Sequence, residues 1–197
     1  MVLAAGLSRR MGRDKLFLPF GSGSVLSTVL DLFRGAPFDR VVVVTSPDRA
    51  SAVAALSPDA TLVVNEHPER GQSRSLALAV EALGEEPRPF ALLLGDMPLV
   101  RRSDVERLHE GFTRRPRGKT ALVPERRGRF GHPSFYEPLW KARFREVEGD
   151  EGGRGRLRLF AEEVLFIPEA DRLFMDADTP RDYLELLERQ QKEEEER

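Results

Sequence analysis

A short loop near the start of the chain carries fixed positive charge and gives the first indication of its chemistry. Gly6 follows an apolar run at residues 2–5, and Arg10 and Lys15 come soon after it. A buried strand that ends in a turn of small residues leaves backbone N–H groups available to bind a phosphate. An arginine adds bidentate recognition, and a lysine adds a mobile charge. The segment therefore predicts a triphosphate-binding loop; from these residues alone, the alternative is a basic surface loop after an edge strand.

This loop differs from two common phosphate-binding motifs. A Walker A loop has the pattern G-x-x-x-x-G-K-[ST], whereas here Met11 stands in place of the second glycine and Leu16 follows Lys15. The dinucleotide fingerprint G-x-G-x-x-G does not open here either. A phosphate bound by this loop would therefore be held in a way that differs from both motifs.

Two acidic segments could hold a divalent metal ion. Asp96 follows the apolar run 92–94, and Asp176 and Asp178 follow the apolar run 173–175, which we expect to be a strand. Ligands of open parallel sheets bind beyond the carboxyl ends of the strands, where carboxylates can hold Mg²⁺ against phosphates. Because such an ion usually takes only one or two protein carboxylates, Asp96 and one of the other two would suffice. The competing interpretation is that Asp96 caps the following helix or turn and that Asp178 caps the last helix.

Two further loops are polar enough to contact substrates. Residues 65–76 combine amides, hydroxyls and a helix start, which can bind a nucleobase or its sugar, although a capped loop explains them as well. Arg126, Arg127 and Arg129 precede His132 in a segment that could bind an anionic acceptor. The alternative for this second segment is a solvated hairpin tip.

The apolar pattern predicts an α/β fold. Near-continuous apolar strands at 41–44, 62–64 and 90–94 are separated by amphipathic helices, which indicates a mostly parallel sheet with helices on both faces. The charged residues 191–197 are expected to form a solvated, frayed tail. Helices are expected to begin near Ser24, after Pro47, at Gly71–Ser73, near Ser103 and at Pro180.

Length and composition favour one soluble domain. A chain of 197 residues is long enough for a single core, and the change in texture after Phe112 suggests a nucleotide-binding lobe at 1–112 and an acceptor-binding lobe at 113–190. The 40% of hydrophobic and 32% of charged residues are typical of soluble proteins, and no apolar run is long enough to span a bilayer.

Charge and cysteine content exclude several classes of protein. A net charge of −2 gives no global attraction to nucleic acid. The absence of cysteine excludes disulfides, thiolate catalysis and cysteine zinc sites. The first residues lack the pattern of a signal peptide, so we expect a cytoplasmic protein that binds neither membrane nor nucleic acid.

Taken together, the segments resemble the MobA-like nucleotidyltransferases, and most of all their molybdenum cofactor cytidylyltransferase branch. The resemblance spans nearly the whole chain and rests on segments in the family's order: 3–15, 71–76, 95–98, 131–133, 149–154 and 176–180. It implies a Rossmann-like, three-layer nucleotidyltransferase fold and Mg²⁺ as cofactor. It also implies transfer of a nucleoside monophosphate from an NTP to a phosphorylated acceptor, with molybdopterin as the expected acceptor and a molybdoenzyme as a candidate protein partner.

The resemblance also implies a role for each matching residue. Catalytic roles fall to Arg10, Lys15 and Asp96, and the Mg²⁺ ligands would be Asp96 and Asp178. The nucleotide would contact Leu3, Ala4, Ala5 and Gly6 on the triphosphate side and Gly71, Gln72 and Ser73 on the base side. The acceptor would be flanked by His132 and by a loop that carries Asp150 and Arg154.

The choice of nucleotide is balanced between two features. The turn Ala4-Ala5-Gly6 favours CTP, whereas the pair Asp14-Lys15 is similar to the guanylyl-transferring branch. Three alternatives therefore stay open: guanylyl transfer to the same cofactor, nucleotidyl transfer to a sugar phosphate or another phosphorylated metabolite, and a non-catalytic protein that delivers the cofactor.

Overall fold

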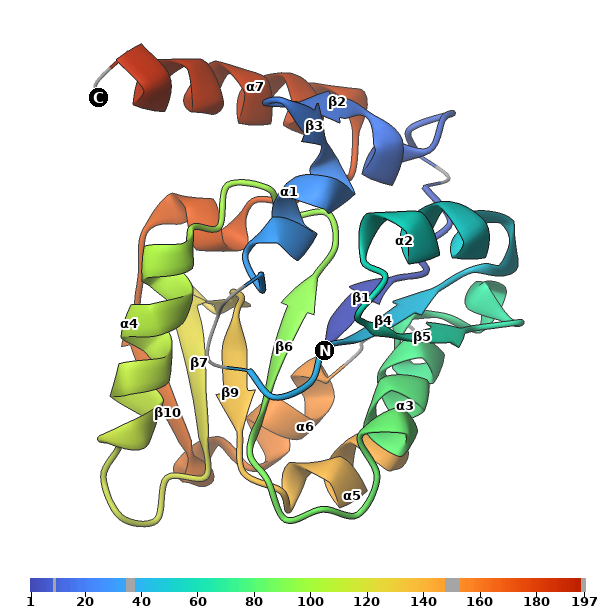
Figure 1. The fold of residues 1–197 in the computed structure, drawn as a ribbon. Helices are drawn as coiled ribbons and strands as arrows, with labels where there is room; N and C mark the ends of the chain where they lie inside the picture. The colour runs from blue at the N-terminus through green and yellow to red at the C-terminus, as the bar shows by residue number, and fades with distance from the viewer. Residues whose placement is uncertain (9, 35–37, 148–152, 196–197) are drawn as a thin grey trace.

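The computed structural model describes residues 1–8, 10–34, 38–147 and 153–195. Its centre is an eight-stranded sheet in the order β10-β7-β9-β6-β1-β4-β5, with β8 paired to β7 (Figure 1). Strand β9 runs antiparallel to β6 and β7, and β8 runs antiparallel to β7, whereas the other pairs are parallel. The strands of this sheet are β1 (Val2–Ala4), β4 (Val42–Thr45), β5 (Thr61–Val64), β6 (Phe90–Leu94), β7 (Ala121–Arg126), β8 (Arg129–Phe130), β9 (Ser134–Tyr136) and β10 (Val164–Pro168).

Helices connect these strands, and a small ribbon stands apart from the sheet. The ribbon pairs β2 (Pro19–Phe20) with β3 (Gly23–Ser24) in antiparallel fashion. The α-helices are α1 (Val25–Asp31), α2 (Ala50–Leu56), α3 (Gln72–Leu83), α4 (Arg102–Thr113), α5 (Trp140–Arg145), α6 (Arg154–Leu159) and α7 (Pro180–Glu195). The 3₁₀ turns are η1 (Lys15–Phe17), η2 (Pro47–Arg49), η3 (Pro68–Arg70), η4 (Ala161–Glu163) and η5 (Asp171–Phe174).

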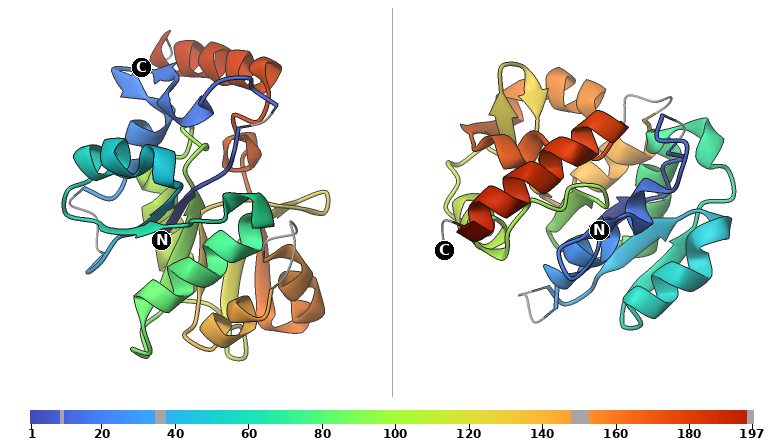
Figure 2. Two further views of the ribbon diagram at one scale, coloured as in Figure 1. Left: turned by 90° about the vertical axis from the view of Figure 1, so that its right-hand side faces the viewer. Right: turned by 90° about the horizontal axis from the view of Figure 1, so that it is seen from above.

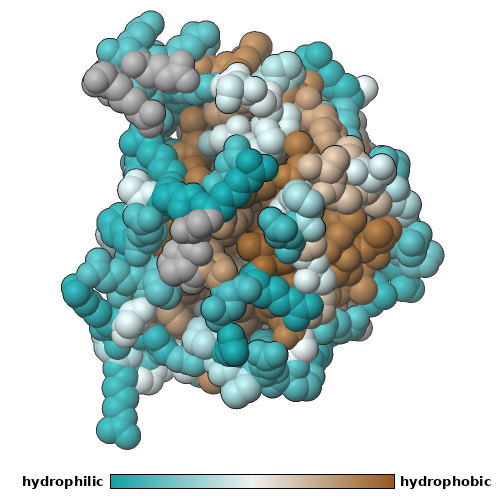
Figure 3. All heavy atoms as spheres, in the orientation of Figure 1, coloured by the Kyte–Doolittle hydropathy of each residue, from teal (hydrophilic) through white to brown (hydrophobic). Residues whose placement is uncertain are grey.

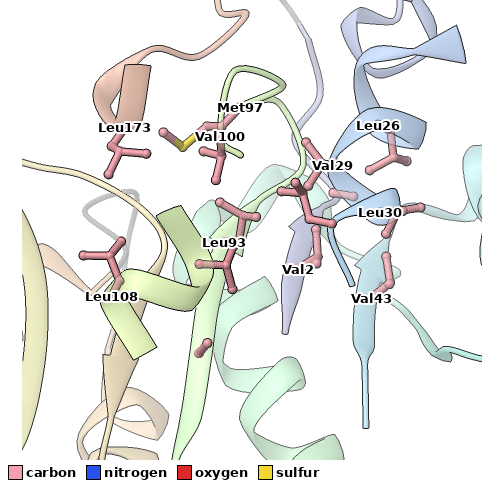
Figure 4. Close-up of a cluster of buried hydrophobic side chains, with 14 of the residues drawn as sticks. Val2, Leu26, Val29, Leu30, Val43, Leu93, Met97, Val100, Leu108 and Leu173 are labelled. Carbon is pink, nitrogen blue, oxygen red and sulfur yellow. The ribbon is translucent and has the colours of Figure 1, made fainter. Parts of the chain in front are cut away.

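The sheet is covered on both faces, as the apolar pattern predicts. On one face, helices α1, α2 and α4 supply Val29, Val53 and Leu108, which join a cluster with Val2 and Leu93 of the sheet (Figures 1 and 4). Removing a side chain such as Leu93 from water contributes about 1.5–3 kcal/mol.

The opposite face is built from α3, α5 and α6. Leu76, Trp140 and Leu157 of these helices pack with Leu3 and Val44 in a second cluster. Successive strand residues point to opposite faces, so Val2 and Leu3 of one short strand belong to different clusters. The result is the expected Rossmann-like three-layer arrangement.

Helix α7 lies across the end of the sheet that carries the loops after β1 and β6 (Figure 2). It packs on the β2–β3 ribbon through a small third cluster that includes Phe20, Leu99 and Leu186. The hydroxyl of Tyr183 donates a hydrogen bond to the carbonyl of Pro19 at 2.6 Å. These contacts bring the segment before α7 to the same edge of the sheet as the N-terminal loop.

Two predictions of local structure were wrong. The run 173–175 is not a strand: Leu173 and Phe174 end η5, where one turn buries both side chains against the core. The charged end does not fray from residue 191, because α7 continues to Glu195 and Glu193 forms an ion pair with Arg101 at 2.6 Å.

The proposed lobes share one continuous sheet. Strand β6, from residues 1–112, pairs with β9, from residues 113–190. The view in Figure 3 shows brown, hydrophobic surface between teal, hydrophilic residues on one face of the molecule. Within the described ranges, no helix is both long enough and apolar enough to cross a membrane.

Candidate active site

A cleft of about 490 Å³ lies beyond the carboxyl ends of β1 and β6. Because β1 pairs with β4 and β6, the N-terminal loop follows a central strand, and the edge-strand alternative is wrong. Most of the predicted site residues line this cleft: Leu3, Ala4, Ala5, Gly6, Arg10, Lys15, Gly71, Gln72, Asp96, Arg154, Asp176 and Asp178.

Close packing of Gly95 against α1 and β1 positions Asp96, the next residue, in the lining of the cleft. A Cβ on the preceding Gly95 would meet the Leu26 Cδ1 at 3.0 Å and the Ala4 Cβ at 3.2 Å, so a side chain there would push β6 away from its neighbours. The carbonyl of Asp96 accepts a hydrogen bond from the Ala177 N–H at 3.0 Å. This bond ties the end of β6 to the acidic segment before α7.

Lys15 lies between two carboxylates. Its Nζ donates to Asp96 Oδ2 at 2.5 Å and to Asp178 Oδ1 at 2.7 Å. Burial alone would lower the pKa of Lys15, but the charges and hydrogen bonds of the two carboxylates outweigh it and raise the pKa above its ordinary value. The Lys15 ammonium therefore stays charged where it lies between the two carboxylates.

Asp178 also binds the second predicted cation. Its Oδ2 accepts a hydrogen bond from Arg10 at 2.6 Å, and the Arg10 side chain is 70% exposed. Burial would raise the pKa of Asp178, but Lys15 and Arg10 lower it below the usual value. Asp178 is therefore ionised near neutral pH.

The capping alternatives for both aspartates are wrong. Thr179 caps α7, since its Oγ1 accepts from the Asp182 N–H at 3.2 Å and its own N–H donates to Asp182 Oδ2 at 2.8 Å. Helix α4 begins six positions after Asp96, and Asp104 accepts from the N–H of its N-cap, Arg101, at 3.0 Å. Neither Asp96 nor Asp178 is needed for these helix starts.

Asp176 also lines the cleft, close to Asp96 and Asp178. Burial, followed by the negative charges of Asp96 and Asp178, raises its pKa to about 6. Of the two acidic residues that the sequence offers before α7, Asp178 contacts Lys15 and Arg10, whereas Asp176 faces the cleft beside them.

The loop 65–76 lines the other side of the cleft, but not through all the predicted residues. Gly71 adopts φ 90°, a conformation that favours glycine, and leads into α3. Ser73 is buried with 2% exposure and is absent from the described lining, where Ser75 stands instead. Ser75 accepts a hydrogen bond from the buried Asn65 at 2.9 Å. The start of α3 therefore turns Ser75, and not Ser73, toward the cleft, and the contact of Ser73 with the base stays a prediction.

His132 lies in a smaller pocket that adjoins the cleft. The two share Leu3, Gln72 and Arg154 in their lining. His132 Nδ1 is 3.2 Å from the Leu92 carbonyl, and burial lowers its pKa to about 4. The imidazole is therefore neutral near pH 7.

The three predicted arginines line a separate pocket of about 420 Å³ together with Asp171 and Asp176. Arg127 and Gly128 form the turn of the β7–β8 hairpin, as the hairpin alternative expects. Arg126 pairs with Asp171, while Arg129 donates to the Phe174 carbonyl at 2.9 Å.

Asp150 lies outside the described residues, so its expected place beside the acceptor stays a prediction.

Sequence reasoning missed Arg49, at the end of η2. Its Nε donates to Asp14 Oδ2 and its Nη1 donates to the Gly6 carbonyl, each at 2.6 Å. Asp14 also accepts from the Leu16 N–H at 3.2 Å and caps the turn that carries Lys15. An arginine four positions after the last residue of β4 was the available signal, but its partners Gly6 and Asp14 lie far away in the sequence.

The carboxylates fit a divalent cation of the Mg²⁺ or Mn²⁺ type. Asp96 Oδ1 is buried and has no hydrogen-bond partner within the described part of the chain. Hard cations of this kind prefer carboxylate oxygens and usually keep several positions for water and phosphate. Among described residues, no group of three or more His, Cys, Asp or Glu side chains is arranged to hold a metal. A metal ion held by Asp96 and Asp178 would therefore need further ligands from water or from the substrate phosphates.

Comparison with known proteins gives a consistent family. The model of the MobA-like NTP transferase domain matches residues 1–165. Purine catabolism protein PucB of Bacillus subtilis is 30% identical over 195 residues, which are 92% of this chain and 91% of that protein. Bifunctional protein GlmU of Paramagnetospirillum magneticum is 31% identical over 137 residues, 66% of this chain, but the match spans only 30% of GlmU.

Solved structures agree with this match. The crystal structure of Rv0371c from Mycobacterium tuberculosis H37Rv has a TM-score of 0.80 at 30% identity and covers 95% of each chain. A manganese complex of Rv0371c has a TM-score of 0.76 at 27% identity and covers 95% of this chain and 96% of that one.

Proposed function

Because the chain belongs to the MobA-like NTP transferase family and is a nucleotidyltransferase, we propose that it transfers CMP from CTP to the terminal phosphate of molybdopterin, with Mg²⁺ as cofactor. The observation that carries this proposal is the position of Lys15 Nζ between Asp96 and Asp178 on the floor of the cleft. Positive charge and paired carboxylates at the carboxyl ends of parallel strands suit a magnesium-bound triphosphate.

The reaction is an in-line displacement at the α-phosphorus. An oxygen of the acceptor phosphate forms the new P–O bond, and the bond from the α-phosphorus to the bridging oxygen breaks, so that pyrophosphate leaves with the electron pair. Both reactants are anionic, so the protein's task is alignment and compensation of charge, and no general base is needed. Arg10 and Lys15 would stabilise the charge that builds toward pyrophosphate.

Asp96 and Asp178 would hold the metal ion, and the bound ion would neutralise part of the negative charge of the phosphates. The divalent-metal requirement is supported by the unpartnered Asp96 Oδ1 and by the manganese complex of the similar Rv0371c. On the acceptor side, Arg154 borders both the cleft and the His132 pocket, so it can contact a phosphate that enters between them.

The environment of Asp14 supports CTP over GTP. In the sequence this residue was the feature in favour of the guanylyl branch, yet its carboxylate binds Arg49 and the Leu16 N–H and is absent from the described lining of the cleft. Asp14 therefore has a structural role that is independent of the base. The product would pass to a molybdoenzyme as protein partner.

A pyrophosphate-release screen tests this proposal. CTP, GTP, ATP and UTP are each combined with molybdopterin and with common sugar phosphates, in Mg²⁺ or Mn²⁺, and the products are identified by mass spectrometry. We expect release with CTP and molybdopterin, and loss of release in Asp96→Asn. Pyrophosphate release with a sugar phosphate and not with molybdopterin would show that the acceptor is a sugar phosphate. Binding of molybdopterin without pyrophosphate release from any NTP would favour the delivery-protein alternative.

A further inference from the structure

We propose that Arg49 and Asp14 are positioning residues that hold the N-terminal phosphate-binding loop in its binding conformation. This inference rests on the proposed function, since it assigns the loop a triphosphate ligand. It concerns residues that are absent from the described lining of the cleft and so act through other groups.

Arg49 joins both ends of the loop. It enters from η2, directly after β4, which pairs with β1. Its side chain is only 6% exposed and reaches Gly6 at the start of the loop and Asp14 at its end, each at 2.6 Å. A third contact runs from Arg49 Nη2 to Ser8 Oγ at 3.3 Å. One buried guanidinium therefore contacts three points of the loop, whose described residues between Gly6 and Asp14 form no strand or helix.

The contact to Gly6 orients the next amide. In a trans peptide the C=O and the following N–H point in opposite directions. With the Gly6 carbonyl directed at Arg49, the Leu7 N–H must point away from Arg49, and Leu7 lines the cleft. Amides fixed in this way suit an anion because they need no rearrangement when it binds.

Ser8 shows that the loop needs this support. Its φ is 49°, a left-handed value that a serine adopts at a cost in free energy. Its Oγ accepts from Arg49 at 3.3 Å and from the Lys15 N–H at 3.4 Å, which compensates for that cost. The Ser8 turn is thus held by the same guanidinium that holds Gly6.

Asp14 extends the support to Lys15. One carboxylate oxygen accepts from Arg49 and the other accepts from the Leu16 N–H at the first turn of η1. The pair therefore sets both the loop backbone and the start of the turn that directs Lys15 to Asp96. We expect loss of the pair to weaken triphosphate binding more than it slows the chemical step of the bound complex.

The test compares Arg49→Met and Arg49→Lys with a matched control. Arg143→Met breaks the partly buried Arg143–Glu163 pair, which joins α5 to η4 and is absent from the described lining of the cleft. The first measurement is hydrogen–deuterium exchange of the enzyme without ligand. We expect faster exchange of peptides that cover residues 5–16 in Arg49→Met, less in Arg49→Lys, and unchanged exchange there in Arg143→Met.

The second measurement is the affinity for Mg²⁺-tripolyphosphate and Mg²⁺-CTP, together with KM and kcat. We expect Kd and KM to rise about tenfold or more in Arg49→Met, with a smaller change in kcat, and Asp14→Asn to show a weaker form of the same pattern. Where Arg49→Met fails to fold, Arg49→Lys and Asp14→Asn carry the comparison.

The outcomes separate this inference from the proposed function. Unchanged exchange of the loop in Arg49→Met, or an equal rise of Kd in Arg143→Met, overturns the positioning role. If wild-type enzyme bound neither triphosphate, the proposed function would fail, and the exchange experiment would still decide whether the pair orders the loop.

Discussion

The Nζ of Lys15 lies 2.5 Å from Asp96 Oδ2 and bridges it to Asp178, so a lysine ammonium stands between the two carboxylates that we assign to a divalent cation. We expect a cation that binds both carboxylates to displace this ammonium, because the two positive charges compete for the same pair of side chains. The displaced Lys15 would be free to bind the triphosphate, which would link the arrival of metal to that of nucleotide.

This geometry predicts the metal affinity of Lys15→Met. In the absence of nucleotide, we expect the variant to bind Mn²⁺ about tenfold more tightly than wild type, because a competing positive charge is removed from two carboxylates in a partly buried site. Turnover should fall about 10²–10³-fold, the usual cost of one electrostatic contact to the transition state.

Titration of Mn²⁺ followed by electron paramagnetic resonance measures this affinity directly. Lys141→Met is the control, since Lys141 is equally buried but donates to the carbonyls of Gly84 and Glu86 on another part of the molecule. Equal Mn²⁺ affinity of Lys15→Met and wild type would show that the ammonium does not compete with the metal.

Asp96→Asn should remove the metal dependence of nucleotide binding. The amide keeps the shape of the side chain but lacks the charge that a hard cation needs, and it leaves Lys15 with Asp178 as its one carboxylate partner. Calorimetry of CTP binding with and without Mg²⁺ gives the comparison. If wild-type enzyme bound CTP equally well without any divalent cation, the metal role of Asp96 would be wrong.

The fold was predictable where a pattern is local. Continuous apolar runs located the core strands, because these strands are buried on both faces. Helical periodicity located α1 and α3, because each of these helices buries one face. Three apolar residues at 173–175, in contrast, fit a strand or one buried turn equally well. Only the core around Leu173 selects the turn.

The site was predictable where a motif is contiguous. Lys15, Asp96 and Asp178 each follow a recognisable segment, and the fold brings them together. Arg49 could not be found in this way, because its contact to Gly6 spans 43 positions and has no local pattern. The choice of Ser75 over Ser73 depends on the rotation of α3 about its axis, which a serine-rich helix start does not reveal.

His132 predicts how stability depends on pH. Its pKa is lowered to about 4 in the folded protein, below the ordinary value of 6.5, because burial disfavours the charged form. The folded state therefore binds fewer protons than the unfolded state between about pH 4 and pH 6.5. The free energy of unfolding should decrease as pH falls from 6.5 toward 4, by at most about 1.4 kcal/mol per pH unit from this group.

His132→Asn should reduce that decrease, because its amide N–H can still donate to the Leu92 carbonyl but does not titrate. Urea unfolding at pH 7 and pH 5 measures the difference. His67→Asn serves as control, since the His67 side chain is 60% exposed. Identical losses of stability in wild type and His132→Asn would contradict a neutral, buried His132.

The last prediction concerns nucleotide choice. We expect kcat/KM with molybdopterin to favour CTP over GTP by roughly 10–200-fold, the range that one or two hydrogen bonds to a base edge provide. Because Asp14 binds Arg49 and the Leu16 N–H, Asp14→Asn should lower the efficiency for both nucleotides by a similar factor and leave their ratio unchanged. Steady-state kinetics with each nucleotide in both proteins gives the four values needed. A preference for GTP in wild type that disappears in Asp14→Asn would restore Asp14 as a determinant of the base and move the protein to the guanylyl-transferring branch.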